Sequence, residues 1–228
     1  LESAERARER LTFDEALLLQ LLLGQRRAEI VKLTTKNRTP NTPVLVKAFE
    51  AKLPFKYTLG QQAVNAEIEK DLSNNYPMHR LLQGEVGSGK TVVALRAMLS
   101  VVDSGGQAAL LAPTEVLAQQ HHRTIKKLLG ELADAGTLQA GEIGTSVELL
   151  TGSMSAAQKK EIHTKLASGQ IGIVIGTHAL ISDGVTFTDL GLVVVDEQHR
   201  FGVEQRDALR MKAKQPPHLL VMTATPIP

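Results

Sequence analysis

The spacing of hydrophobic and polar residues divides the chain into two parts. Residues 1–33, rich in Glu, Arg and Leu, predict one helix, and residues 44–53 and 61–72 predict two shorter ones. The polar, Pro-containing stretch 34–43 predicts a linker. From Met78 onward, short apolar runs alternate with helical stretches; the runs are 80–83, 108–112, 147–151, 171–176, 192–196 and 219–223.

These runs are apolar throughout and lack strict alternation, which indicates strands buried on both faces of a parallel sheet. Helix signals separate them. Thr114 precedes a helix that runs to about residue 129, and Ser155 with Gln158 forms a capping box for a helix that Gly169 ends. The alternation predicts an α/β fold, a mostly parallel sheet flanked by helices and preceded by a short helical segment.

Composition narrows the chemistry. The 228 residues carry 26 Lys and Arg against 24 Asp and Glu, and this net charge of +2 gives no reason by itself to expect a nucleic-acid partner. The absence of Cys excludes a disulfide framework, a Cys-ligated zinc site and a thiol nucleophile, and is compatible with the cytoplasm, where we expect the protein. Two Tyr and five Phe, with no Trp, argue against a base-stacking platform as the main binding mode.

No run approaches the roughly 18 uninterrupted apolar residues that span a bilayer, so we expect no membrane segment. In the most apolar helical stretch we expect Leu17, Leu18, Leu21 and Leu22 to pack on one side. The chain starts with Leu and stops after VMTATPIP, and we expect it to be a fragment.

A phosphate-binding motif lies after the first apolar run. Residues 84–91 (GEVGSGKT) match GxxxxGK[ST] at every fixed position and open a helix. The glycines let backbone N–H groups converge on phosphate oxygens, Lys90 reaches the β- and γ-phosphates, and Thr91 ligates Mg²⁺. A Gly-rich strand–helix turn with an incidental Lys is the alternative. We predict ATP binding through six residues of the motif: Gly84, Gly87, Ser88, Gly89, Lys90 and Thr91.

An acidic pair ends the fifth apolar run. Asp196 and Glu197 would stand at the carboxyl edge of the sheet, where open α/β sheets bind ligands. We expect Asp196 to hold Mg²⁺, mostly through its water shell, and Glu197 to polarise the attacking water. Gln198 and His199 follow, placed to sense the γ-phosphate or to relay to a neighbouring strand. A solvated strand end is the alternative.

Together these stretches resemble helicase superfamily 2, and within it the bacterial translocases that act on branched DNA in recombination and fork repair. Transcription–repair coupling factors are the nearest competitor; they share APT, GTH, RFGV and TATPIP, but typically read DEEHRFG and carry an aromatic residue in the phosphate loop. Here Gln198 and Ser88 stand at those positions. The resemblance is carried by LPFKYTLGQQ, RLLQGEVGSGKTVVA, LLAPTEVLAQQH, IGTHAL, VVVDEQHRFGVEQR and VMTATPIP.

For the nucleotide, the resemblance implies that Gln61 hydrogen-bonds the adenine edge, with Gln62 as the neighbouring register. Phe55 either stacks on the base or belongs to the core. The catalytic residues implied are Lys90, Asp196, Glu197 and His199.

For DNA, the resemblance implies backbone contacts from turns that hold Thr114, Thr177 and His178, and a third turn at residues 152–153. Thr114 merely capping its helix is the alternative. Thr223 and Thr225, with Gln198, would link nucleotide state to DNA grip.

The domain layout implied is a helical connector at 1–50 and the first of two RecA-like helicase domains at 51–228. The second RecA-like domain, with its arginine fingers, and the wedge domain would lie outside this sequence. The intact protein would be a monomeric ATP-dependent DNA helicase acting on forks and Holliday junctions, and a single-strand-binding protein stays open as a partner. We expect the fragment to bind Mg-ATP and hydrolyse it weakly. A coupling-factor motor and a nucleotide-binding module without activity are the alternatives.

Overall fold

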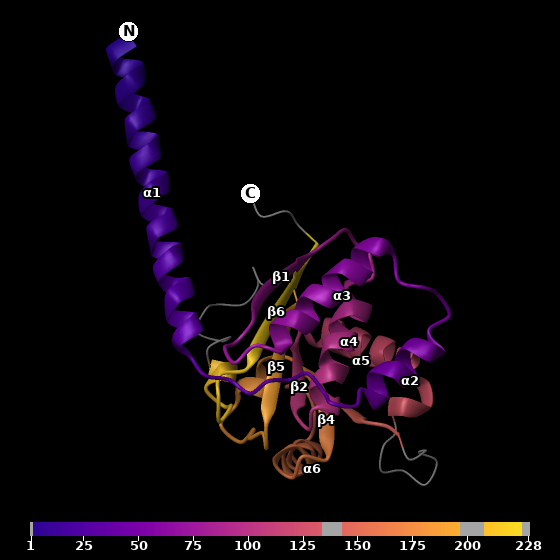
Figure 1. Cartoon of the computed structure of the whole chain (residues 1–228). Helices are drawn as coiled ribbons and strands as arrows, with labels where there is room; N and C mark the ends of the chain where they lie inside the picture. The colour runs from indigo at the N-terminus through magenta and orange to yellow at the C-terminus, as the bar shows by residue number, and fades with distance from the viewer. Residues whose placement is uncertain (1, 134–142, 197–207, 225–228) are drawn as a thin grey trace.

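A six-stranded parallel sheet forms the centre of the molecule (Figure 1). The computed structural model describes residues 2–133, 143–196 and 208–224, the side chains of residues 2–4 and 7 excepted. The strands are β1 (His79–Gln83), β2 (Gln107–Leu111), β3 (Ser146–Leu150), β4 (Ile171–Gly176), β5 (Leu190–Asp196) and β6 (His218–Thr223), in the order β1-β6-β5-β2-β4-β3. All five strand pairings are parallel, so the predicted α/β class and all six predicted strands are confirmed.

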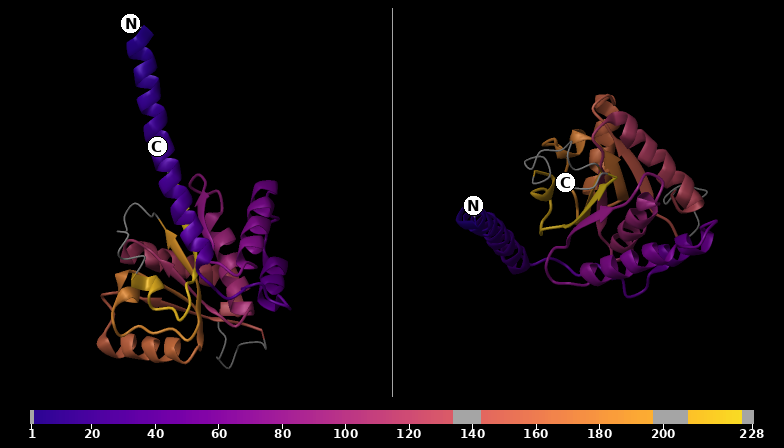
Figure 2. Two further views of the ribbon diagram at one scale, coloured as in Figure 1. Left: turned by 60° about the vertical axis from the view of Figure 1, so that its left-hand side comes forward. Right: turned by 90° about the horizontal axis from the view of Figure 1, so that it is seen from above.

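Helices cover both faces of this sheet, as Figures 1 and 2 show. Neighbouring residues of the central strands alternate between two cores: Ala108 and Leu110 of β2 face one core, whereas Ala109 and Leu111 face the other. Because both faces are buried, the inner strands β2, β4, β5 and β6 are mostly apolar along their length. The helices are α1 (Glu2–Lys32), α2 (Val44–Lys52), α3 (Leu59–Leu72), α4 (Lys90–Asp103), α5 (Glu115–Leu129) and α6 (Ala156–Ala167), with short 3-10 helices η1 (Gly130–Ala133) and η2 (His178–Ile181).

Local sequence signals set the ends of these helices. The Thr114 hydroxyl accepts from the Leu117 N–H and begins α5, and Ser155 with Gln158 forms the predicted capping box of α6. A second capping box, formed by Thr58 and Gln61, begins α3. The caps at Thr114 and Ser155 were predicted, whereas the box at Thr58 was not, because the helix was expected to begin at residue 61. All three depend on residues three apart.

The segment between α1 and α3 is part of the domain body, which corrects two expectations. Residues 34–43 are not a free linker: Thr35 and Arg38 are buried, and the Arg38 guanidinium pairs with Asp189. The predicted boundary at residue 50 also falls inside packed structure, because α2 buries Phe49 in the same core as α4. The polar composition of residues 34–43 suggested a linker. In the structure, however, the Thr35 hydroxyl donates to the Pro216 carbonyl and Arg38 pairs with Asp189.

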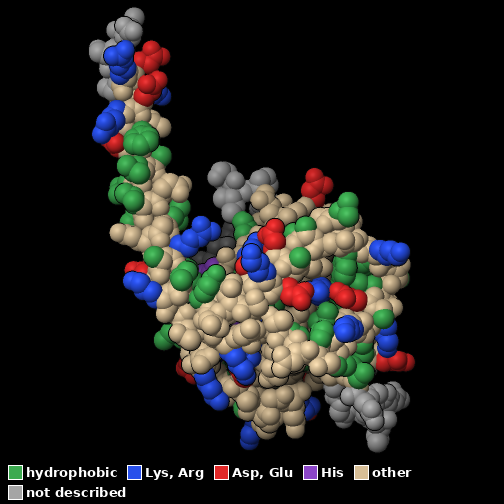
Figure 3. Space-filling view, viewed as in Figure 1, with side chains coloured by type: hydrophobic (Ala, Val, Ile, Leu, Met, Phe, Trp, Pro, Cys, Tyr) green, Lys and Arg blue, Asp and Glu red, His purple; other side chains and the backbone are tan. Residues whose placement is uncertain are grey.

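Helix α1 projects away from the body in every view (Figures 1 and 2). The expectation that its leucines pack together is wrong here: Leu17, Leu18, Leu21 and Leu22 are 45–61% exposed. Hydrophobic side chains gather along the middle of this helix on the face seen in Figure 3. Across the described residues, no helix is both long and apolar enough to cross a membrane.

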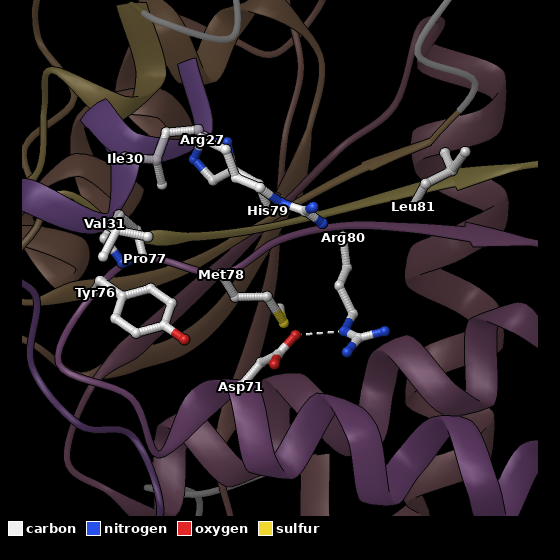
Figure 4. A pocket seen from close by; sticks show the side chains of 10 residues that line it. All are labelled: Arg27, Ile30, Val31, Asp71, Tyr76, Pro77, Met78, His79, Arg80 and Leu81. Atoms are coloured by element: carbon white, nitrogen blue, oxygen red, sulfur yellow. Dashed lines mark hydrogen bonds and ion pairs between the residues drawn. The ribbon is translucent and has the colours of Figure 1, made fainter. Parts of the chain in front are cut away.

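A pocket of about 440 Å³ lies where α1 meets the edge strand β1 (Figure 4). Arg27 and Val31 come from α1, and His79 and Arg80 from β1. Asp71, on α3, forms an ion pair with Arg80. None of the predicted site residues lines this pocket.

Candidate nucleotide and nucleic-acid site

All six strands end at one edge of the sheet, because all of them are parallel. The segments that follow β1 and β5 hold the residues predicted to contact the nucleotide, and the end of β6 holds residues predicted to link nucleotide state to DNA grip. The segments after β2, β4 and β3, at the other half of the edge, are those predicted to contact DNA. The strand order therefore separates the two predicted sets of residues into adjacent halves of a single edge, the usual ligand-binding edge of an open α/β sheet.

The phosphate loop folds around the Lys90 ammonium. Its Nζ donates hydrogen bonds to the carbonyl oxygens of Gly84, at 2.6 Å, and Glu85, at 2.8 Å. The Ser88 N–H donates to the Glu85 carbonyl at 3.1 Å, closing the turn. Lys90 and Thr91 open α4, so the positive end of the helix dipole and the lysine charge lie together, an arrangement that suits an anion such as phosphate.

Two glycines of the loop are needed for distinct reasons. Gly89 caps α4 with φ of 82°, and a Cβ placed on it would stand 2.5 Å from the Gln61 Nε2. Gly84 has no unusual φ, but a Cβ there would stand 2.7 Å from the Ser88 Oγ. A Cβ at either position would require the Gln61 or the Ser88 side chain to move, so the loop is closely packed around these two glycines.

Gln61 connects α3 to this loop. Its Oε1 accepts from the Thr58 N–H at 3.0 Å, while its Nε2 donates to the Ser88 carbonyl at 2.9 Å. A cavity of about 270 Å³ lies between the start of α3 and the loop, lined in part by Gln61, Gly84 and Lys90. Gln62 instead donates to the Tyr57 carbonyl, and Phe55 is 45% exposed, outside the core. Of these two glutamines, Gln61 is the one whose side chain contacts the phosphate loop.

Asp196 ends β5 beside a partner that the sequence did not reveal. The Nε2 of His121, on α5, lies 2.7 Å from the Asp196 Oδ2, and the two side chains are 13% and 16% exposed. His121 was missed because it is 75 positions away in the chain. One signal was available: Ala118 and Ile125 are buried at helical spacing, which places a residue at position 121 or 122 on the same inward face.

The turns predicted to face DNA lie side by side and are bonded to each other. Glu115 accepts from the Ser153 N–H at 2.9 Å and from the Ser153 hydroxyl at 2.5 Å, so the turn after β2 is joined to the turn after β3. These hydrogen bonds lower the pKa of the Glu115 carboxyl. In the turn after β4, Thr177 is buried at 3% exposure whereas His178 is exposed.

The remaining predicted residues divide into one that the structure describes and four that it does not. Thr223 ends β6 and is buried, and its carbonyl accepts from the Gly84 N–H at 3.3 Å, which joins the end of β6 to the phosphate loop. The other four predicted residues, Glu197, Gln198, His199 and Thr225, lie outside the described residues.

The donor set suits magnesium with a phosphate. Across the described residues, no group of three His, Cys, Asp or Glu side chains could enclose a metal. Mg²⁺ is commonly held by one or two carboxylates together with phosphate oxygens and water. Asp196 at the strand end and the Thr91 hydroxyl in the first turn of α4 are donors of this kind.

Residues 58–228 match the family model for DEAD/DEAH box helicases, so the chain belongs to this helicase family. The match includes Gln61, the phosphate loop, Asp196 and all the turns at the carboxyl edge.

Named relatives lie in one group of bacterial helicases. The chain is 58% identical to the ATP-dependent DNA helicase RecG of Mycobacterium bovis, over 98% of this chain and 31% of that protein. It is 47% identical to the RecG of Aquifex aeolicus, over 96% of this chain and 26% of that protein. The chain thus spans about a third of the length of these relatives, and the predicted resemblance to this bacterial group is confirmed.

Solved structures agree. A structure of RecG bound to a three-way DNA junction superposes with a TM-score of 0.81 at 40% identity, covering 98% of this chain and 28% of that one. Yeast Dbp5, in a complex with Nup159, Gle1, IP6 and ADP, superposes with a TM-score of 0.56 at 17% identity, covering 82% of this chain and 47% of that chain. The second likeness concerns the fold alone.

Proposed function

We propose that this chain is the ATP-binding motor domain of a RecG-type, ATP-dependent DNA helicase that remodels branched DNA such as forks and Holliday junctions. The observation that carries the proposal is the division of the sheet edge. The phosphate loop and Asp196 share one half, while the turns at Thr114 and His178 share the other. The identity of 58% to a helicase named as ATP-dependent supports the same conclusion.

In the nucleotide half, Lys90 would leave the carbonyls of its own loop and bind the β- and γ-phosphates. Thr91 and Asp196 would hold Mg²⁺, and Glu197 would act as the base that polarises water, with His199 beside it. Gln61 would exchange its bond to Ser88 for the adenine edge. The fit of the loop to phosphate supports this assignment: a loop closely packed around two glycines lies at a helix start.

In the DNA half, the exposed side chain of His178 and the helix start capped by Thr114 would contact the sugar–phosphate backbone. Thr177 is buried, so its part would be to hold that turn. Gln198, Thr223 and Thr225 would connect the two halves. The bond between the Thr223 carbonyl and Gly84 supports this role for the end of β6.

We also propose that α1 belongs to a helical connector and that the body of the chain is the first of two RecA-like domains. A second RecA-like domain would supply arginines to the transferring phosphate, which are worth about 10³–10⁵ in rate in other nucleotide hydrolases. This chain alone would bind Mg-ATP and hydrolyse it weakly, as a monomer in the cytoplasm. A single-strand-binding protein is a further partner to test.

The experiment is ATP hydrolysis by the 228-residue chain with and without forked DNA, beside Lys90→Ala and with nucleotide binding measured in parallel. We expect nucleotide binding that Lys90→Ala weakens by about 10²-fold, because the loop loses the ammonium group proposed to bind the β- and γ-phosphates. Hydrolysis should stay near the level of the variant. Among the described residues, Lys90 bonds to two carbonyls of its own loop, so its loss should change stability little.

Other results would change the proposal. Equal nucleotide binding by the parent and Lys90→Ala would overturn the nucleotide site itself. Strong turnover that forked DNA stimulates and Lys90→Ala abolishes would show that the chain completes its own site, against the two-domain proposal. Binding without turnover in a longer RecG-type protein that includes this chain would favour a nucleotide-binding module.

A further inference from the structure

Helix α5 belongs to both halves of the edge. It begins at the Thr114 cap, directly after β2, and its first residue, Glu115, is bonded to Ser153 in the turn after β3. Two turns further along, His121 contacts Asp196 at the end of β5. One rigid helix therefore contacts the turns assigned to DNA and the carboxylate assigned to Mg²⁺.

The contact between His121 and Asp196 is close and sheltered. At 2.7 Å it is within hydrogen-bonding distance, and both side chains are less than one fifth exposed. An imidazole N–H that donates to one oxygen of a carboxylate fixes the rotation of that carboxylate. The other carboxylate oxygen can still accept from the water shell of a cation. Residues that bond to metal-ligating carboxylates typically change metal affinity by about 10–100-fold when removed.

We infer that His121 is a positioning residue: it orients the Asp196 carboxylate for Mg²⁺ and fastens that carboxylate to α5. The inference rests on the proposed function, because it takes Asp196 as a magnesium ligand. His121 touches neither nucleotide nor DNA in this account; it acts through Asp196. A displacement of α5 at the turns that face DNA would then reach the magnesium ligand through this bond.

The neighbouring residue provides a matched control. The His122 Nε2 lies 3.3 Å from the Val147 carbonyl of β3, and its ring is also partly buried. Burial lowers the pKa of His122. Replacing His122 removes an imidazole of the same size from the same helix turn but leaves Asp196 alone.

The test measures binding of a fluorescent ADP to the whole chain, in excess Mg²⁺ and in EDTA. The ratio of the two dissociation constants gives the gain that the metal provides. We expect His121→Ala to reduce this gain by about 10-fold while binding in EDTA stays unchanged. His121→Gln, which keeps a side-chain N–H at a similar reach, should restore most of the gain, and His122→Ala should keep all of it.

A double variant gives a second readout. If His121 acts through Asp196, then His121→Ala combined with Asp196→Asn should lose no more of the gain than Asp196→Asn alone. Equal gains for His121→Ala and the parent, or additive losses in the double variant, would overturn the inference and leave the proposed function in place. No metal-dependent gain in the parent, or none lost in Asp196→Asn, would overturn the assignment of Asp196 and the inference together.

Discussion

The two halves of the nucleotide site are held in different ways. The phosphate loop is closed mainly by bonds within itself: Lys90 bonds to carbonyls five and six residues before it, and Ser88 bonds back to Glu85. Two further bonds tie it to Gln61 and to the end of β6. Asp196 instead depends on distant parts of the chain. Its neighbours in the sheet belong to β2 and β6, and its side-chain partner is 75 residues away.

A sequence motif predicts a site best where the residues that shape the site are close together in the chain. A loop that closes on itself brings its geometry with it, so eight residues suffice to predict what it binds. What a carboxylate at a strand end can bind depends on the neighbouring strands and helices, which are distant in the sequence. The same contrast separates the local and the long-range contributions to stability, which can be tested one at a time.

The largest effect should come from acid acting on a contact between distant segments of the chain. His218, at the start of β6, is fully buried; its Nδ1 accepts from the Met78 N–H at 3.0 Å, which joins β6 to the segment before β1. Burial lowers the pKa of His218 from 6.5 to about 4. In that pH window the unfolded chain binds more protons than the folded one, so the free energy of unfolding should fall by about 3 kcal/mol as the pH is lowered through it.

His218→Asn is the control, because its amide oxygen can still accept from Met78 but does not titrate. Urea unfolding of both proteins at several pH values between 4 and 7 measures the difference. Parallel pH dependences in the parent and His218→Asn would contradict the prediction.

A somewhat smaller effect should distinguish two glycines, one in the phosphate loop and one at a contact between two strands. A Cβ at Gly176, the end of β4, would stand 2.2 Å from the Leu150 carbonyl of β3, so Gly176→Ala must push two strands apart. We expect a loss of about 2–3 kcal/mol in the free energy of unfolding. Gly87→Ala meets open space in the loop and pays only for its φ of 84°, about 1 kcal/mol.

Urea unfolding of the two variants at neutral pH measures this difference. Equal losses in the free energy of unfolding would mean that the ends of β3 and β4 accommodate a Cβ as easily as the loop does. The contrast between long-range and local contacts would then be wrong.

The smallest effect should come from two capping boxes that are alike locally but differ in place. Thr58→Ala and Ser155→Ala each remove a capping hydroxyl and should each cost about 1 kcal/mol of stability. The Thr58 hydroxyl accepts from the Gln61 N–H, and the Gln61 side chain bonds to the phosphate loop, whereas Ser155 caps α6 on the other face of the sheet. Only Thr58→Ala should weaken nucleotide binding, by a few-fold, in a titration with fluorescent ADP. Equal weakening in both variants would point to a general loss of stability.

The sequence alone was enough for the six strands, the helix caps and the phosphate loop, because each depends on residues within a few positions of one another. It also predicted that Asp196 would stand at the carboxyl edge of the sheet and that Thr114 and Thr177 would lie on turns that follow strands.

Only the tertiary structure decided which strands are neighbours and what fills the space between them. The order β1-β6-β5-β2-β4-β3 places the ends of β1, β6 and β5 along one half of the edge and those of β2, β4 and β3 along the other, and the proposed nucleotide and nucleic-acid sites rest on this division. His121 beside Asp196 and Arg38 inside the domain body are contacts across 75 and 151 positions. Contacts between such distant segments depend on how the whole chain packs, so they cannot be predicted from a short stretch of sequence.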